Sequence, residues 1–243
     1  MAYGFRIMVE GDYACYTRPE MKVERVSYDV PTPGAVEGIL KSVYWKPAIR
    51  YVVDKIVVFN PIKFTNIRRN EAKEKLSLQK IKGAMKGSGV SPAIEISAAN
   101  DSISQRGGMI LKDVRYGIEF HFELTGIKSD KEDECEEKHY NIILRRLKNG
   151  QHFRQPVLGC REFSVKSLTL TDEFPMKEIS EELKGDRDLG FMLYKMKFED
   201  GGIPINNDWE EPIFSDRADA VYYRPHMIDG VIDVAKYRGD LKC

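Results

Sequence analysis

The chain of 243 residues lacks several features that would assign it to a familiar class. Its four cysteines, Cys15, Cys135, Cys160 and Cys243, lie far apart and form no C-x-x-C pair, which argues against a structural zinc site. No apolar run approaches the ~18 residues that suggest a membrane-spanning helix. The absence of a signal peptide favours a reducing compartment. We therefore expect a soluble protein of the cytoplasm.

The sequence also lacks an excess of charge of either sign, because Lys plus Arg and Asp plus Glu number 38 each. Net charge therefore gives no indication for or against binding of nucleic acid. The charges are unevenly distributed, however: residues 66–86 are rich in Lys and Arg, whereas residues 130–137 are almost wholly acidic. A chain with charges segregated in this way can bind a polyanion on one face while it stays neutral overall.

Hydrophobic periodicity predicts an α+β core. The expected elements are, in chain order, a strand from Phe5 to Gly11, a helix capped by Thr32 and opened by Pro33, strands in 51–64 and 115–124, a helix over about 135–148, and a strand over 163–170. This order is the ferredoxin-like βαββαβ pattern that RNA-recognition domains also use. We expect residues 1–172 to form this RNA-binding and catalytic domain and residues 173–243 to form a small β-rich C-terminal domain. Trp45, near the end of the first helix, is expected in the core.

The connection from Thr65 to about Gly108 is far longer than an ordinary hairpin loop, and such length usually indicates function or disorder. It carries Arg68, Arg69 and Lys73 among other basic residues. One interpretation is a solvated, mobile loop. The other is a basic insertion, over about 66–108, that grips RNA or a partner subunit.

The dipeptide Lys138-His139 is the strongest candidate for chemistry. Histidine is the side chain whose ordinary pKa lets it give or take a proton near neutral pH. A neighbouring lysine supplies a fixed positive charge, which suits an anion that becomes more negative as it reacts. By itself the dipeptide fits a solvated helix start better than a catalytic site. A catalytic role therefore needs support from other parts of the sequence.

Several basic residues are candidates for contact with RNA. They are Lys46, Arg68, Arg69, Lys73, Arg145, Arg146, Arg154 and Arg161. Arg161 belongs to the turn Gly159-Cys160-Arg161, which offers backbone N–H groups and a guanidinium to an anion, although a plain turn before a strand fits equally well. His121 and His152 are weaker candidates that could lie against RNA.

A series of short motifs follows in a fixed order along the chain. They are Gly11-Asp12-Tyr13-Ala14, Ser27-Tyr28, Val30-Pro31-Thr32, Tyr44-Trp45-Lys46-Pro47, Leu111-Lys112-Asp113-Val114, Lys138-His139-Tyr140 and Leu158-Gly159-Cys160-Arg161-Glu162. With these motifs the chain resembles the CRISPR-associated Cas-five family, in its type I-C (Dvulg) subtype. The resemblance covers about residues 5–170 well and the last third poorly.

The resemblance implies a metal-independent endoribonuclease that needs no cofactor and cuts precursor CRISPR RNA beside the repeat hairpin. It implies that the protein then stays on the 5′ end of the guide, with the backbone and large subunits of a Cascade-type complex as partners, and it leaves weak DNA binding open. The family's catalytic Tyr, Lys and His match Tyr44, Lys138 and His139. The basic connection after Thr65 departs from the family, so no binding residue is carried over there.

Metal-independent cleavage would use the RNA's own 2′-hydroxyl, giving a 2′,3′-cyclic phosphate and a free 5′-hydroxyl. His139 would donate a proton to the leaving oxygen, and Lys138 would offset charge on the phosphate. Tyr44 would orient the 2′-hydroxyl, because a phenol is a poor base at neutral pH. It could instead be a packed aromatic with its hydroxyl at the surface. The alternative function is a non-catalytic RNA-binding subunit, and a metal-dependent DNA nuclease is a distant third.

Overall fold

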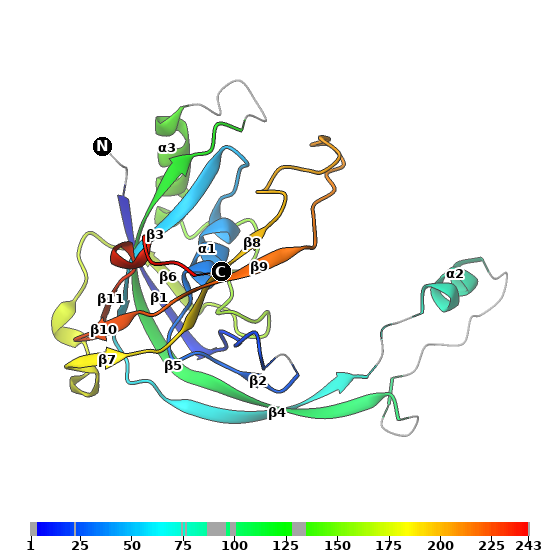
Figure 1. Cartoon of the computed structure of the whole chain (residues 1–243), viewed down its shortest axis with the longest axis horizontal. Coiled ribbons are helices and arrows are strands. Elements are labelled where there is room, and N and C mark those ends of the chain that lie inside the picture. The colour runs from blue at the N-terminus through cyan, green and yellow to red at the C-terminus, as the bar shows by residue number, and fades with distance from the viewer. Residues whose placement is uncertain are drawn as a thin grey trace.

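The computed structural model describes residues 4–21, 23–73, 75, 77–86, 96–97, 101–127 and 135–242. Its main feature is a large, mostly antiparallel sheet, against which two helices pack and from which a long two-stranded arm projects (Figure 1). Within these residues no helix is both long and apolar enough to cross a membrane. Much of the acidic run, residues 130–134, lies outside the described part of the chain.

Four strands form the centre of the sheet. They are β1 (Gly4–Ala14), β3 (Ile49–Val58), β5 (Ile103–Leu124) and β6 (Ser167–Leu170), neighbouring one another in the order β6-β1-β5-β3 and all antiparallel. Ile118 on β5 lies opposite Ile7 on one side and Ile56 on the other, and all three are buried. Alternation of apolar residues therefore places one face of each strand in a common core.

Two helices cover this core. Helix α1 (Pro33–Val43) begins where expected, because Thr32 Oγ1 accepts a hydrogen bond from the Ala35 N–H at 3.2 Å. It ends before Tyr44, whose extended backbone leads toward Pro47. Helix α3 (Glu136–Lys148) ends at Asn149, and Gly150 follows with a φ of +63°. α1 connects β1 to β3, and α3 connects β5 to β6.

The connection after Thr65 is not an irregular loop. Strand β4 (Phe64–Ala72) pairs with the first half of β5, from Phe64 opposite Leu111 to Ala72 opposite Ile103. Together they form the arm seen in Figure 1, with α2 (Leu78–Lys86) near its tip and β2 (Arg25–Val26) paired near its base. β5 thus starts at Ile103 and not near residue 115 as expected. Most side chains of β4 are polar or charged, and only Ile67 packs against the core, so β4 shows no apolar alternation.

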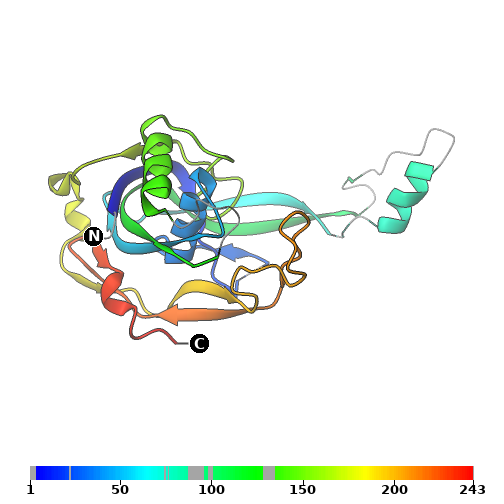
Figure 2. The same cartoon turned by 90° about the horizontal axis from the view of Figure 1, so that it is seen from above.

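The segment after residue 172 joins the main sheet. Its strands are β7 (Asp186–Asp188), β8 (Met192–Phe198), β9 (Ala218–Tyr223), β10 (His226–Ile228) and β11 (Val231–Asp233), and its short 3₁₀ helices are η1 (Met176–Glu178), η2 (Glu181–Leu183) and η3 (Ala235–Tyr237). β11 pairs with β3 and extends the sheet through β10 to β7, while β8 and β9 form a separate pair. α1 packs against both β3 and β8 (Figure 2). The expected boundary at residue 172 therefore divides one sheet and one core.

Candidate functional site

Tyr44 and His139, which are 95 residues apart in the sequence, meet between the two helices. Tyr44 follows the last turn of α1, and His139 lies in the first turn of α3. Their side chains share a hydrogen bond of 2.9 Å between Tyr44 Oη and His139 Nδ1. Tyr44 is 5% exposed and His139 is 0% exposed. The Tyr44 hydroxyl is therefore buried and bonded to His139, whereas a merely packed tyrosine was expected to have its hydroxyl at the surface.

This contact can persist in both protonation states of the imidazole. A phenol oxygen both donates and accepts hydrogen bonds, and each ring nitrogen of histidine can do either, depending on its proton. When the imidazole is neutral, Tyr44 can donate to Nδ1, which leaves the proton on Nε2. When it is protonated, Nδ1–H donates to the phenol oxygen. With these proton positions, Nε2 carries a hydrogen in both states.

Three further side chains hold the pair in place. Arg146 lies with its guanidinium 5.3 Å from the centre of the Tyr44 ring and donates a hydrogen bond of 2.6 Å to the Val43 carbonyl. Tyr51 Oη donates to the Tyr44 carbonyl at 2.7 Å. Phe122 meets the His139 ring edge-on, with ring centres 6.2 Å apart. Burial raises the pKa of the Tyr51 hydroxyl, so this donor stays protonated.

Lys138 lies beside His139 and is half-buried, in the first turn of α3. The N-terminal end of a helix carries a partial positive charge, so this position favours an anion. Lys138 and His139 therefore lie at the start of a helix. Adjacent residues on a helix point about 100° apart, so two of them can reach one phosphate only near a helix end. Lys46 is half-buried near the end of α1. Trp45 was expected in the core but is 46% exposed, because the chain leaves the helix before it.

The remaining basic candidates have different surroundings. Arg145, Arg154 and Arg161 are exposed, as expected of residues that contact RNA. Arg146 is half-buried against Tyr44, which favours a positioning role. A cavity of about 410 Å³ lies beside it, lined by polar side chains that include His152 and Lys166. His121 is also only partly exposed, and its Nδ1 lies 2.7 Å from Asp54 Oδ2.

The arm divides its basic residues between two faces. Arg68 is exposed, whereas Arg69, the next residue of β4, points the other way and forms ion pairs with Glu71 and Glu162. Lys73 pairs with Asp101 across the ribbon. The three residues therefore do not make one continuous basic patch. The sequence did not indicate that Tyr51 contacts Tyr44 or that Glu71 and Glu162 pair with Arg69, because these contacts exist only in the folded chain.

Arg146 gives a test that separates positioning from RNA binding. If Tyr44 and His139 take part in RNA cleavage, as the resemblance implies, Arg146→Ala is expected to slow cleavage at saturating RNA by roughly tenfold, because the Tyr44 ring loses the guanidinium beside it and the end of α1 loses a hydrogen bond. The slope of log affinity against log salt should stay unchanged. Arg146→Lys should recover little, since lysine cannot keep both contacts. The exposed neighbour Arg145→Ala is the matched control and should do the reverse, flattening the slope while preserving the rate. A flattened slope with an unchanged rate for Arg146→Ala would contradict the positioning role.

The fold and this site define an α+β protein with a buried, hydrogen-bonded tyrosine–histidine pair between two helices and with a projecting two-stranded arm. A family model described as CRISPR-associated protein (Cas_Cas5) matches residues 5–235. The chain is 42% identical over 239 residues to a protein of Mannheimia succiniciproducens named CRISPR pre-crRNA endoribonuclease Cas5d, with 98% of this chain and 97% of the relative covered. A protein of the same name from Thermus thermophilus is 36% identical over 200 residues, which cover 82% of this chain and 76% of the relative. The chain belongs to the Cas-five (Cas5) family, in its type I-C group, Cas5d.

Solved structures share the fold at low sequence identity. One, described as a crystal structure of a CRISPR-associated protein, has a TM-score of 0.61 and 22% identity, with 96% of this chain and 91% of that chain covered. Another, the protein SMU1763c from Streptococcus mutans, has a TM-score of 0.61 and 21% identity, with 95% and 91% covered. Both support the α+β architecture.

Proposed function

We propose that this protein is a metal-independent endoribonuclease that cleaves precursor CRISPR RNA within the repeat, next to its hairpin. The hydrogen bond between Tyr44 and His139 is the observation that carries the proposal, because it joins two of the three expected catalytic residues. The names of the two curated relatives support the same substrate and reaction. The reaction would take place in the cytoplasm, and the product would stay bound through its 5′ end.

The central strands support a finer description of the fold. The strand order β6-β1-β5-β3, with α1 and α3 as the two crossing helices, is the arrangement that a βαββαβ chain gives in ferredoxin-like domains. We infer that these six elements form a ferredoxin-like unit of the type used by RNA-recognition domains. The arm, β2 and the strands after residue 172 are additions to it.

The proposed reaction begins with attack of the 2′-hydroxyl on the adjacent phosphate, as the proton of that hydroxyl passes to solvent water. The bond to the 5′-oxygen of the next nucleotide breaks, and a 2′,3′-cyclic phosphate forms. His139, as imidazolium, would donate its Nε2 proton to that leaving oxygen, while Nδ1–H stays bonded to Tyr44. Because the His139 side chain is fully buried, contact with RNA requires the residues that cover it to move apart. Catalytic hydrogen bonds often form only in the complex with substrate.

Lys138 and Tyr44 would take different parts in this reaction. Lys138 would offset the charge that gathers on the non-bridging phosphate oxygens, with help from the start of α3. Tyr44 was expected to orient the 2′-hydroxyl. Its hydroxyl is engaged with His139 in the free chain, so it would either keep the imidazole oriented or exchange that bond for one to the RNA.

Tyr44→Phe separates these two roles, because phenylalanine keeps the ring and removes only the hydroxyl. If Tyr44 orients His139, cleavage should fall by roughly tenfold, about the worth of one hydrogen bond to a buried group. Affinity for the RNA should not change. The double variant with His139→Ala should then cleave no more slowly than His139→Ala alone, because the two residues act as one unit. A double variant that loses the product of both factors would assign Tyr44 to the RNA instead.

We further propose that the arm holds RNA or a partner subunit of a Cascade-type complex, including its backbone and large subunits. The exposed guanidinium of Arg68 is free of the acidic network that engages Arg69. Residues 173–243 would serve assembly or hairpin grip, since Tyr44, Lys138 and His139 all precede them. Weak DNA binding would use the same basic surfaces.

Neutralising the arm one residue at a time tests its role. Arg68→Gln is expected to weaken RNA binding and to lower the salt slope by about one, because one phosphate contact is lost. Arg69→Gln should leave the slope nearly unchanged, because its charge already faces Glu71 and Glu162. Fluorescence anisotropy with repeat RNA at several salt concentrations measures both. Equal slopes for native protein and Arg68→Gln would assign that residue to partner contact or to solvent.

The alternative function is a non-catalytic subunit that binds RNA and caps a guide complex. Both functions require basic surfaces and partner subunits, so cleavage alone separates them. Incubating the protein with its own repeat RNA in the presence of chelator distinguishes the two functions. A single cut beside the hairpin, with a 2′,3′-cyclic phosphate, supports the endoribonuclease, whereas intact bound RNA supports the subunit.

A further inference from the structure

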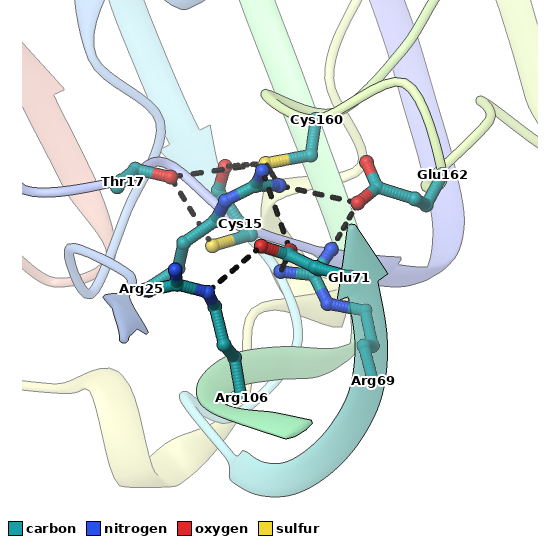
Figure 3. A network of polar contacts seen from close by, with 8 residues as sticks. All are labelled: Cys15, Thr17, Arg25, Arg69, Glu71, Arg106, Cys160 and Glu162. Carbon is teal, nitrogen blue, oxygen red and sulfur yellow. Dashed lines mark hydrogen bonds and ion pairs between the residues drawn. The ribbon is translucent and has the colours of Figure 1, made fainter. Parts of the chain in front are cut away.

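Two cysteines that the proposed reaction does not use lie together at the base of the arm. Cys15 follows the last residue of β1, and Cys160 belongs to the turn after Leu158. Both are free thiols. The hydroxyl of Thr17 lies between them, 3.5 Å from the sulfur of Cys15 and 3.7 Å from that of Cys160 (Figure 3). Cys15 is buried, whereas Cys160 is partly exposed.

The backbone fixes this arrangement. The Cys15 N–H donates to the Leu158 carbonyl at 3.0 Å, which ties the end of β1 to the turn. Gly159 has a φ of +87°, and a Cβ there would lie 2.0 Å from the Cys15 carbonyl oxygen. Only glycine permits this approach. The Cys160 sulfur lies 3.6 Å from the same carbonyl oxygen. The two thiols are therefore held close by main chain that cannot separate without breaking this contact.

The surroundings favour a negative charge on one sulfur and a proton on the other. The neighbouring Cys15 thiol, the Thr17 hydroxyl 3.7 Å away and the guanidinium of Arg25, whose Nη1 lies 3.5 Å away, together lower the pKa of Cys160 to about 6, although burial opposes them. The hydrogen bond to Cys160 and burial raise the pKa of Cys15. Glu162 and the Cys15 carbonyl oppose the thiolate. The donors outweigh them, because Glu162 is itself paired with Arg25 and Arg69.

We infer that Cys160 is a reactive cysteine, with Cys15 as its resolving partner, and that hydroperoxides oxidise the pair to a disulfide at the base of the arm. The geometry has the three parts that such a site needs. It has a partly exposed sulfur beside a guanidinium, a second, buried thiol that contacts the same Thr17 hydroxyl, and a rigid turn that ties the two segments together. The exposed Cys135 is well separated from both in the sequence and has no such setting in the described structure.

The oxidation would proceed in two balanced steps. The Cys160 thiolate attacks one oxygen of the hydroperoxide, so a sulfur–oxygen bond forms, the O–O bond breaks, and an alkoxide or hydroxide leaves. This gives a sulfenic acid on Cys160. Cys15 then loses its proton and attacks the Cys160 sulfur, which forms the S–S bond and releases the hydroxyl as water. Two electrons pass from the two thiols to the peroxide.

A network of ion pairs connects the two cysteines to the arm, so a change at the cysteines would alter the contacts of the arm. Arg25 bonds to Cys160 and to Glu162, and it lies 3.7 Å from Glu71 of β4, which also pairs with Arg106 of β5 (Figure 3). A disulfide would remove the thiolate and leave Arg25 with only its carboxylate partners. The oxidation state of two sulfurs would therefore alter the contacts that join the arm to the body.

The test uses the full-length protein, fully reduced, with Cys135→Ser as the working background. Brief exposure to hydrogen peroxide should give a disulfide-linked peptide pair containing Cys15 and Cys160, seen by mass spectrometry without reductant and lost on reduction. In Cys15→Ser the sulfenic acid should persist on Cys160 and be trapped by dimedone. In Cys160→Ser, Cys15 should remain a thiol. Circular dichroism confirms that each variant is folded, and Cys15→Ala replaces Cys15→Ser if the buried hydroxyl prevents folding.

A second measurement, independent of peroxide, follows alkylation of Cys160 by iodoacetamide. Between pH 7 and 9 the native rate should change less than twofold, because the sulfur is already ionised at pH 7. In denaturant the same residue should react more than tenfold faster at pH 9 than at pH 7, as an ordinary thiol does. Cys15→Ala should restore much of that pH dependence, Arg25→Gln should restore a smaller part of it, and Arg25→Lys should restore none.

Three outcomes would overturn the inference. They are oxidation without a Cys15–Cys160 link, a native alkylation rate that rises with pH as steeply as in denaturant, and a pH dependence that Arg25→Gln leaves unchanged. None of these readouts uses RNA. A failed cleavage assay therefore leaves the cysteine site standing, and a missing disulfide leaves the proposed cleavage untouched.

Discussion

At saturating repeat RNA, His139→Ala is expected to cleave at least about a hundredfold more slowly than the native protein, with RNA affinity unchanged. The substitution removes the proposed proton donor at the leaving oxygen but no charge on which RNA binding depends. Chelator should change neither result. Because His139 is fully buried, alanine also leaves a cavity, so His139→Gln serves as a second variant that keeps a polar side chain. The exposed His152→Ala is the matched control and should cleave at nearly the native rate.

The substrate provides the complementary test. A 2′-deoxyribose at the nucleotide before the cut should block the native protein as completely as His139→Ala does, because the nucleophile is gone. A product with a 3′-hydroxyl, rescue by magnesium, or cutting of the deoxy substrate would each mean that water attacks with the help of metal. Full activity of His139→Ala would favour the non-catalytic subunit.

Gly159→Ala is expected to destabilise the fold by roughly 3 kcal/mol or more, which is the sum of a left-handed backbone cost and severe crowding. The residue has a φ of +87°, and the new Cβ would lie 2.0 Å from the Cys15 carbonyl oxygen. That neighbour is main chain directly after β1, and its N–H is bonded to the Leu158 carbonyl, so it cannot swing aside. Chemical denaturation monitored by circular dichroism measures the loss of free energy.

Gly150→Ala is the matched control for this substitution. Gly150 also has a positive φ, of +63°, but nothing lies within 4 Å of its added Cβ. Gly150→Ala should lower the free energy of unfolding by about 1 kcal/mol, from the left-handed backbone alone. Equal losses at the two positions would mean that the close approach at Gly159 relaxes at little cost and that the turn is less rigid than its contacts indicate.

The sequence predicted what local rules decide. The alternation of Phe5, Ile7 and Val9 and the cap at Thr32 were confirmed, because side-chain period and capping depend only on nearby residues. The pairing of Tyr44 with His139 has no local signal. The resemblance assigned both residues to one catalytic site but did not predict their contact, which the hydrogen bond between the two side chains shows.

What the sequence missed depends on distant contacts. The connection after Thr65 was interpreted as a mobile loop or a basic insertion, because β4 carries mostly polar and charged residues and gives no strand pattern of alternating apolar residues. Trp45 was placed in the core from its size, although the chain turns outward there. Arg146 was assigned to RNA from its charge. Its packing on Tyr44 became visible only when α1 and α3 came together.

Strand β5 has a further consequence, because it is a single continuous element of 22 residues. Its first half builds the arm, and its far end carries Phe122, which touches His139. At ~3.3 Å per residue its contour is roughly 70 Å long. If the arm grips RNA, the length of β5 sets the distance between the RNA contact and the site of cleavage. Adding one residue to β5 would turn every side chain beyond it to the opposite face, so the strand can be lengthened without that reversal only in steps of two residues.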